Sequence, residues 1–315
     1  MAHASRPKTT AELLMELEPV VATELDRHLS TAKEWFPHEY VPWSEGRDFD
    51  GVLGGEAWSV EDSKVTPEAR AALVVNLLTE DNLPGYHREI ATLFGRDGAW
   101  GTWVNRWTAE ENRHGIVIRD YLTVTRAVDP VALERARMIH MEGGYEADHG
   151  DKMLHSLAYV SFQELATRVS HRNTGKASGD PICERLLARV AADENLHMLF
   201  YRNVLAAAFE LAPGETMRAV TDVVKNFQMP GHTIEGFMRK SVAIANAGIY
   251  DLRLHLDDVL SPVLRQWGVF EMEGLDGEGE KAREELSEFL KGVDTAASRF
   301  VERRAARRAR QAARA

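Results

Sequence analysis

The chain has 315 residues, of which 44% are hydrophobic, a formal net charge of −11 and a single cysteine, Cys183. This length can bury a substantial core, and the acidic balance argues against nucleic acid as a general partner. No apolar run reaches the about eighteen residues that a membrane span needs, so we expect no span, and we expect no secretory signal. A lone thiol fits the reducing cytoplasm.

Apolar residues recur at spacings of three and four, and sustained alternation is absent, so the sequence predicts an all-α protein. Thr66-Pro67, Asp129-Pro130 and Asp180-Pro181 are typical helix starts, because the polar residue caps and the proline fits the first turn. We expect helices, in chain order, at about 11–35, 66–94, 100–126, 130–141, 151–171, 181–211, 213–227, 233–264 and 280–315. The glycine- and proline-containing segment 36–65 is expected to be irregular.

Two copies of one pattern stand out on four of these helices. A glutamate is followed about thirty residues later by Glu-x-x-His: first Glu80 with Glu111 and His114, then Glu164 with Glu194 and His197. Residues three apart share a helix face, so each pair can reach one ion, and the upstream glutamate fits a preceding antiparallel helix. The gaps, 31 residues from Glu80 to Glu111 and 30 from Glu164 to Glu194, are nearly equal. The sequence therefore predicts a dinuclear metal site with these six ligands.

Chance can produce the short motif. Glu146 and His149 have the same spacing, but glycines flank them, so we expect a loop and no ligand pair there. For the six residues, the alternative is solvated charge on helix faces. Carboxylate-rich ligation with two imidazoles suits iron or manganese, whereas a structural zinc would be expected to use thiolates.

An acid precedes each Glu-x-x-His. A ligating imidazole usually donates its second N–H to a carboxylate or carbonyl. We therefore expect Asp193 to hold His114 and, by the pseudo-symmetry, Glu110 to hold His197.

Four strings resemble the soluble acyl-acyl-carrier-protein desaturases, including their actinobacterial relatives: TEDNLP at 79–84, WTAEENRHG at 107–115, SFQELAT at 161–167 and AADENLH at 191–197. The similarity runs in order from about residue 35 to 201 and is weaker beyond. It implies a ferritin-like four-helix bundle with additional packing helices, usually as a homodimer. It also implies a di-iron centre that uses dioxygen and two electrons from ferredoxin to desaturate a chain bound to acyl carrier protein, in a deep apolar tunnel.

The resemblance assigns the same six ligands and adds two residues. Trp35 matches a tryptophan that continues from Asp193 and His114 to the surface as an electron path, although simple packing is the alternative. Thr167 matches a threonine on the oxygen-binding side that could assist proton delivery, although a helix threonine can also bond its own backbone. Glu89 departs from the family pattern, which has an apolar residue near the acyl cavity.

We expect one domain over 1–315, with the metal bundle at about 66–211 and a basic tail at about 299–315 that holds seven arginines. This tail could dock an acidic protein or be a solvated helix end. The enzyme alternative is another di-iron oxygenase, and the non-enzyme alternatives are a catalytically silent acyl-carrier-binding protein and a ferritin-like iron store. The strings argue against a ribonucleotide reductase subunit, and the lack of spans argues against a membrane desaturase.

Overall fold

The computed structural model describes residues 8–145 and 152–313, and these are mostly helical. The described residues form no β-strand and contain a single isolated β-bridge, between Phe49 and Glu56, so the all-α prediction is confirmed. The α-helices are α1 (Thr10–Thr31), α2 (Pro67–Asp81), α3 (Leu83–Phe94), α4 (Gly98–Val124), α5 (Pro130–Glu142), α6 (Met153–Ser178), α7 (Pro181–Leu211), α8 (Pro213–Asn226), α9 (Phe237–Ala247), α10 (Leu252–Leu254), α11 (Ser261–Trp267) and α12 (Gly277–Ala312). Short 3₁₀ turns lie at η1 (Pro37–Glu39), η2 (Trp43–Glu45), η3 (Val60–Asp62) and η4 (Pro230–Thr233), and a π-helical turn lies at η5 (His255–Leu260).

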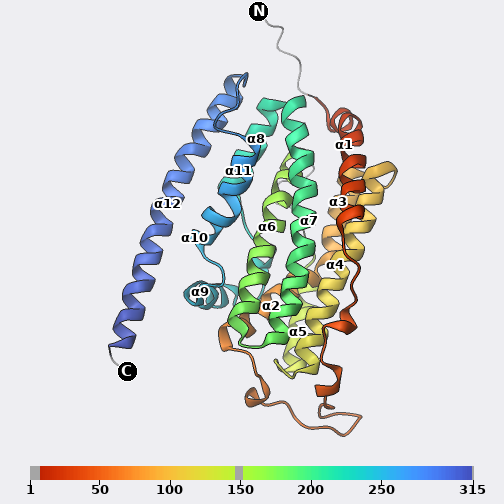
Figure 1. Ribbon diagram of the computed structural model, residues 1–315, viewed down its shortest axis with the longest axis vertical. Coiled ribbons are helices and arrows are strands. Elements are labelled where there is room, and N and C mark those ends of the chain that lie inside the picture. The colour runs from red at the N-terminus through yellow and green to blue at the C-terminus, as the bar shows by residue number, and fades with distance from the viewer. Residues whose placement is uncertain (1–7, 146–151, 314–315) are drawn as a thin grey trace, which may run out of the picture.

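Four helices form a bundle (Figure 1). α2 packs on α4 and α6, and α7 packs on the same two helices, which closes the ring. α1 covers α4 and α7, α3 lies on α4, α5 lies on α2, and α8 joins α6 to the long outer helix α12. Within the described ranges, none of the helices combines the length and the apolar run that crossing a bilayer requires.

The starts of the bundle helices follow the sequence signals. The Thr66 side chain accepts a hydrogen bond from the Ala69 amide at the start of α2. Asp180 does the same for the Ile182 amide at the start of α7, and in both helices a proline occupies the first turn. These caps satisfy amides that have no partner within the helix.

The core consists of two large apolar clusters with a buried polar layer between them. On α4, Trp103 and Trp107 belong to one cluster and Val117 and Ile118 belong to the other. Between these two pairs, the buried side chains of α4 include Glu110, Glu111 and His114. α7 repeats this pattern, so burial of both clusters fixes the depth of the polar layer in the bundle.

The predicted helix at 66–94 is wrong in one respect, because it consists of two helices. α2 ends at Asp81, and α3 starts at Leu83 after the non-helical Asn82. Pro84 explains the break, since proline lacks the amide hydrogen that would bond the Glu80 carbonyl oxygen and its ring clashes with a carbonyl four residues earlier.

The predicted helix at 233–264 is also interrupted. α9 ends at Ala247 and is followed by Gly248, whose φ of +81° is a left-handed conformation that glycine adopts easily; Asp251 then caps α10. Segment 36–65 is irregular apart from its 3₁₀ turns, as expected. Glu146 and His149 lie outside the described residues.

Candidate metal centre

The four bundle helices bring all six predicted ligands into the polar layer. Glu80 comes from α2, Glu164 from α6, and the two Glu-x-x-His pairs come from α4 and α7, all buried. They form two groups of four whose donor atoms lie within 4.8 Å of one another. The first position comprises Glu80, Glu111, His114 and Glu194, and the second comprises Glu111, Glu164, Glu194 and His197. Two glutamates are thus shared, as in a site whose carboxylates bridge two ions.

Unpartnered atoms in this layer test whether cations fit. Five buried atoms of the set make no hydrogen bond: Glu111 Oε1, His114 Nδ1, Glu164 Oε2, Glu194 Oε1 and His197 Nδ1. Yet His197 Nδ1 lies 2.7 Å from Glu111 Oε1, and His114 Nδ1 lies 3.3 Å from Glu194 Oε1. Buried polar atoms are rarely left unsatisfied, and lone pairs that converge in this way suit a metal ion. The residues therefore fit a pair of divalent cations.

The electrostatics of the metal-free layer support the same interpretation. Burial raises the pKa of Glu80 to about 7, the carboxylates of Glu111 and Glu194 add to the rise, and a hydrogen bond from His171 opposes it. Burial also raises the pKa of Glu164 well above its usual value. Burial opposes protonation of His114 and His197, but the surrounding carboxylates outweigh it and place the pKa of both rings well above the ordinary value. Without metal, the layer holds protons that cations would displace.

Each histidine predicted to be a ligand contacts the acidic residue that precedes the other Glu-x-x-His pair. His114 Nε2 lies 3.5 Å from Asp193 Oδ2, which also accepts a 2.7 Å hydrogen bond from Trp35 Nε1. His197 Nε2 lies 2.9 Å from Glu110 Oε2. In both rings Nε2 therefore points away from the predicted metal positions, and Nδ1 faces them.

Arginines neutralise these two acids. Arg113 and Arg189 contact Asp193, and Arg106 forms an ion pair with Glu110. Burial raises the pKa of Asp193, but hydrogen bonds from His114 and Trp35 outweigh it, and the pKa lies below the usual value. The pKa of Glu110 is likewise low, since hydrogen bonds from His197 and His28 overcome its burial. Both acids are therefore ionised acceptors for the rings they face.

The Thr167 hydroxyl lies within hydrogen-bond reach of its own helix backbone and of one predicted ligand. Its hydroxyl is 2.9 Å from the Glu164 carbonyl oxygen and 2.9 Å from Glu194 Oε2. A hydroxyl has one proton, so Thr167 donates either to its own helix or to a shared ligand.

Sequence reasoning missed three buried partners of the site. His28 on α1 lies 2.9 Å from Glu110 Oε2, Trp107 Nε1 donates to Glu164 Oε1 at 2.9 Å, and His171 Nε2 lies 3.1 Å from Glu80 Oε1. Helical spacing could have revealed two of them, because Trp107 precedes Glu111 by four residues and His171 follows Glu164 by seven. His28 lies on a helix without any metal motif, so no local signal marked it.

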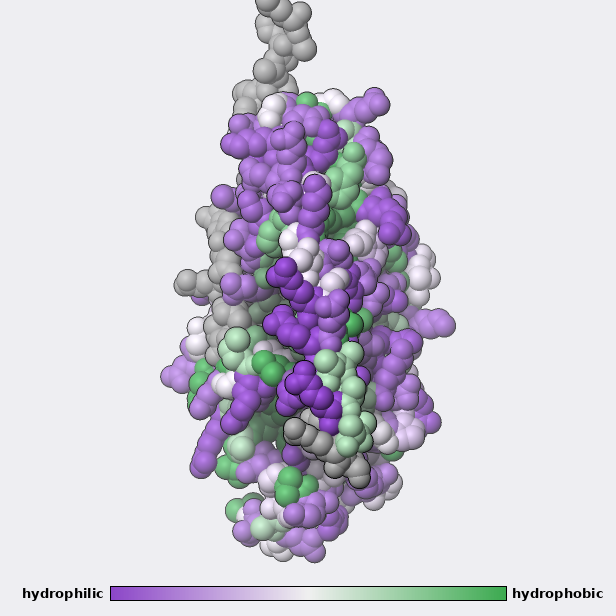
Figure 2. Space-filling model, turned by 90° about the vertical axis from the view of Figure 1, so that its left-hand side faces the viewer, coloured by the Kyte–Doolittle hydropathy of each residue, from purple (hydrophilic) through white to green (hydrophobic). Residues whose placement is uncertain are grey.

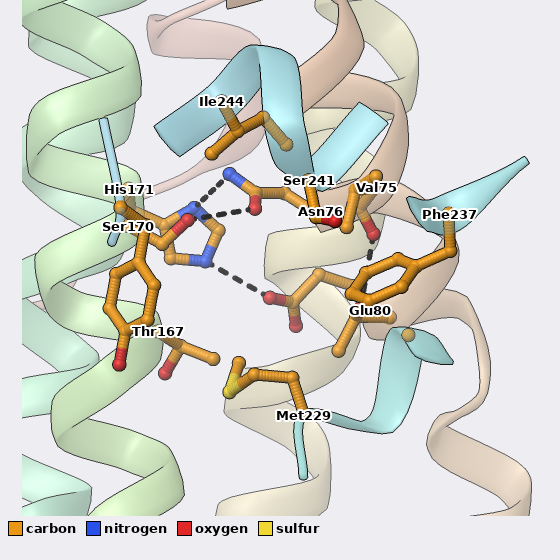
Figure 3. Close-up of a pocket in the computed structure, with 13 residues that line it drawn as sticks. Val75, Asn76, Glu80, Thr167, Ser170, His171, Met229, Phe237, Ser241 and Ile244 are labelled. Atoms are coloured by element: carbon orange, nitrogen blue, oxygen red, sulfur yellow. Dashed lines mark hydrogen bonds and ion pairs between the residues drawn. The ribbon is translucent and has the colours of Figure 1, made fainter. Parts of the chain in front are cut away.

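Three cavities lie in a row beside the centre. The outer and inner cavities share Met229, Ser241 and Tyr250, and the inner and far cavities share Thr79 and Glu80. The inner cavity is lined by Val75, Asn76, Thr79, Glu80, Thr167, Ser170, His171, Met229, Gly231, Phe237, Ser241, Ile244 and Tyr250 (Figure 3). The far cavity adds Tyr86, Glu89, Ile90, Trp107, Glu111, Tyr145, Ser156, Tyr159, Val160, Gln163 and Pro230. Glu80, a predicted metal ligand, thus stands between two largely apolar-walled spaces.

Glu89, at a position where the family pattern has an apolar residue near the acyl cavity, lines the far cavity. Its side chain is 30% exposed, and Arg88 Nη2 lies 3.6 Å from its carboxylate. The charge is therefore partly hydrated and close to a cation, which lowers the cost of placing it beside an apolar wall.

Comparison with known proteins identifies the family. A model of the family "fatty acid desaturase" matches residues 9–315. The chain is 52% identical over 299 residues to a putative acyl-[acyl-carrier-protein] desaturase, DesA1, of Mycobacterium tuberculosis, covering 93% of this chain and 88% of that protein. It is 32% identical over 286 residues to stearoyl-[acyl-carrier-protein] 9-desaturase 6 of Arabidopsis thaliana, covering 85% and 71%.

A solved structure supports the same relationship. The X-ray structure of putative acyl-ACP desaturase DesA2 from M. tuberculosis matches with a TM-score of 0.68 and 33% identity, over 81% of this chain and 94% of that chain. The expected ferritin-like bundle is thereby confirmed. The chain belongs to the fatty acid desaturase family, among its acyl-acyl-carrier-protein desaturases.

Proposed function

We propose that the protein introduces a double bond into a fatty acyl chain bound to acyl carrier protein, using dioxygen and two electrons at a pair of iron ions. The observation that carries this proposal is that two buried groups of glutamates and a histidine, each able to hold a metal ion, share Glu111 and Glu194 next to the row of cavities. Carboxylate-rich donor sets favour iron or manganese over zinc, and use of dioxygen favours iron.

When bound, the two ions would activate dioxygen, which is the oxidant: the acyl chain loses two hydrogens, and dioxygen takes them together with two electrons and two protons to give two molecules of water. Such an oxidant is needed because an unactivated C–H bond is not acidic, so no side chain can remove its hydrogen as a proton. The chain's own residues position the substrate and keep water out. Val75, Phe237 and Ile244 line the inner cavity, and Ile90 and Val160 line the far one. A chain lying through both would pass Glu80. Thr167, which is within reach of Glu194, is placed to move a proton at that carboxylate.

We place the entry of the acyl chain at the outer cavity, where Phe300 of α12 contributes to the wall. Five exposed arginines lie on the same helix: Arg299, Arg303, Arg307, Arg308 and Arg310. Figure 2, which views the molecule from the α12 side, has hydrophilic residues over most of this face and a group of hydrophobic residues toward its lower end. An acidic carrier protein would be complementary to such a surface.

The remaining partners belong to the same proposal. Trp35, Asp193 and His114 form a continuous path toward the first position, which suits a ferredoxin-type electron donor. Exposed Ile116 of α4 and Val131, Met138 and Ile139 of α5 offer an apolar surface for a homodimer. The buried free thiol of Cys183 fits a cytoplasmic enzyme.

A product assay tests the function. The protein would be loaded with ferrous iron and supplied with oxygen, ferredoxin, its reductase and acyl carrier proteins bearing chains of several lengths, and the released fatty acids analysed. We expect a monounsaturated product that requires both iron and the electron donor. A hydroxylated product would indicate another di-iron oxygenase, and bound but unchanged chains of every length would indicate a silent carrier-binding protein.

A further inference from the structure

A short series of polar side chains crosses the wall of the inner cavity and ends on a predicted metal ligand (Figure 3). Ser170 Oγ lies 3.2 Å from Asn76 Oδ1, Asn76 Nδ2 lies 3.2 Å from His171 Nδ1, and His171 Nε2 lies 3.1 Å from Glu80 Oε1. His171 is 1% exposed and Asn76 is 8% exposed. Such groups are costly to bury unless each makes its hydrogen bonds, so their arrangement requires an explanation.

The series has a direction. The Ser170 hydroxyl donates to the Asn76 carbonyl oxygen, which turns the amide nitrogen of Asn76 toward the histidine ring. That nitrogen donates to Nδ1, so the ring proton lies on Nε2 and points at Glu80. His171 Nε2 is also 3.6 Å from Glu194 Oε1. The ring therefore stands beside Glu80, which belongs to the first position alone, and lies farther from Glu194, which both positions share.

The second position is supported differently. Glu164 Oε1 accepts its hydrogen bond from the indole of Trp107, at 2.9 Å. An indole has a single nitrogen, which always donates, so nothing further has to set its polarity. An imidazole has two nitrogens and can present either a donor or a lone pair, so a neighbour must fix which one faces the ligand.

We propose that His171, oriented by Asn76, is a positioning residue that fixes the Glu80 carboxylate for the first metal position. Trp107 positions the Glu164 carboxylate in the same way for the second metal position. The proposal rests on the dinuclear site of the proposed function, but not on the reaction carried out there. Under this proposal Glu80 and Glu164, the two glutamates that the positions do not share, are held by different residues. Mutations should therefore affect metal binding at one position at a time.

Metal affinity measured one position at a time tests this. His197→Ala leaves the first position with its full set of ligands, and His114→Ala leaves the second. In the full-length protein, anaerobic titration with ferrous ion would be compared in each background with and without His171→Phe. We expect His171→Phe to weaken binding about 10- to 100-fold in the His197→Ala background and less than about twofold in the His114→Ala background. Trp107→Phe is the matched control and should show the opposite preference.

Two further variants separate positioning from general damage. His171→Gln keeps an N–H donor on a side chain of similar reach and should restore most of the affinity. Asn76→Leu leaves His171 in place without its orienting partner and should give a smaller loss at the first position. It also decides the question if His171→Phe does not fold, which far-ultraviolet circular dichroism and thermal melting of the metal-free protein would show.

Equal losses in both backgrounds, or unchanged affinity at the first position in His171→Phe or Asn76→Leu, would overturn the proposal. Because ferrous binding is the readout, the result is independent of desaturation. A protein that binds metal as described but forms no double bond would contradict the proposed function and leave this inference standing.

Discussion

Glu110 and Asp193 occupy equivalent places in the two Glu-x-x-His units, yet their outer partners differ. Glu110 lies between the rings of His197 and His28, and Asp193 lies between the ring of His114 and the indole of Trp35. The Arg113 guanidinium also stacks over the Trp35 ring, 4.8 Å from its centroid. The two ends of a nearly symmetric centre thus have different chemistry, and of the two acids only Asp193 accepts a hydrogen bond from an indole.

Replacement of Trp35 by phenylalanine tests this asymmetry. The variant keeps an aromatic ring but loses the N–H that donates to Asp193. We expect two metal ions per chain to remain and reduction by a ferredoxin-type donor to slow by about tenfold, as for other residues that orient a ligand's partner. Stopped-flow spectroscopy of the iron-loaded protein measures the rate. Trp58→Phe, which removes an indole hydrogen bond to the Arg126 carbonyl, is the control, and an equal rate in the two variants would argue against the path.

At the scale of elements, α7 is anchored at its start by a residue with two tasks. Asp180 Oδ1 accepts from the Ile182 amide at 2.9 Å, and Asp180 Oδ2 accepts from the Tyr121 hydroxyl of α4 at 2.5 Å. One side chain thus caps α7 and ties it to α4, the two helices that carry both Glu-x-x-His pairs.

Asp180→Ala should therefore destabilise the protein more than the loss of an ordinary helix cap does. We expect the free energy of unfolding to fall by about 2–3 kcal/mol. Loss of the cap contributes about 1 kcal/mol, and the rest comes from leaving the buried Tyr121 hydroxyl without its acceptor. Asp129→Ala, at the start of α5, removes a cap without such a partner and should cost only about 1 kcal/mol. Urea denaturation measures both, and equal losses would show that the Tyr121 contact contributes nothing.

The π-helical turn η5 gives a pH dependence. Burial lowers the pKa of its first residue, His255, to about 4, and the Tyr250 hydroxyl lies 2.8 Å from His255 Nδ1. In the unfolded chain the pKa is about 6.5, so between these values the unfolded state binds more protons. Stability contributed by neutral His255 is present above about pH 6.5 and is lost toward pH 4, at up to about 1.4 kcal/mol per pH unit.

His255→Gln should flatten this dependence. The difference in unfolding free energy between pH 7 and pH 5 should be smaller in the variant than in the unmodified protein, by roughly 1–2 kcal/mol. Urea denaturation at the two pH values measures it. The same pH dependence in both proteins would contradict a buried, neutral His255.

At the scale of the whole molecule, the parts that the sequence predicted are those set by spacing along one helix. Glu111 with His114 and Glu194 with His197 share a helix face whatever surrounds them, so the pairs could be read directly. His28 could not be found in this way, because α1 carries no metal motif and the partner Glu110 lies on another helix. The spacing of His171 from Glu164 offered a signal, but its partner Glu80 depends on how α2 and α6 pack. The interruptions at Asn82 and Gly248 were missed because apolar periodicity continues across both. The single domain over 1–315 stays a prediction.

The basic tail illustrates the same limit. As sequence it could be a docking segment or a solvated helix end. In the described residues it continues α12 to Ala312, and two of its arginines hold the end of α9. Arg304 binds Asp251 and, at 2.8 Å, the Ala245 carbonyl oxygen, while Arg308 donates to the Asn246 carbonyl oxygen at 2.7 Å. Part of the basic charge is therefore structural, and only the arginines on the exposed side remain for a partner.

The central claim is that four helices bring six side chains around a pair of metal ions. Anomalous X-ray scattering at the iron edge, from crystals of the protein loaded anaerobically with ferrous iron, tests it most directly. We predict two peaks, one among Glu80, Glu111, His114 and Glu194 and the other among Glu111, Glu164, Glu194 and His197. A single peak, or peaks outside these two groups, would contradict the account.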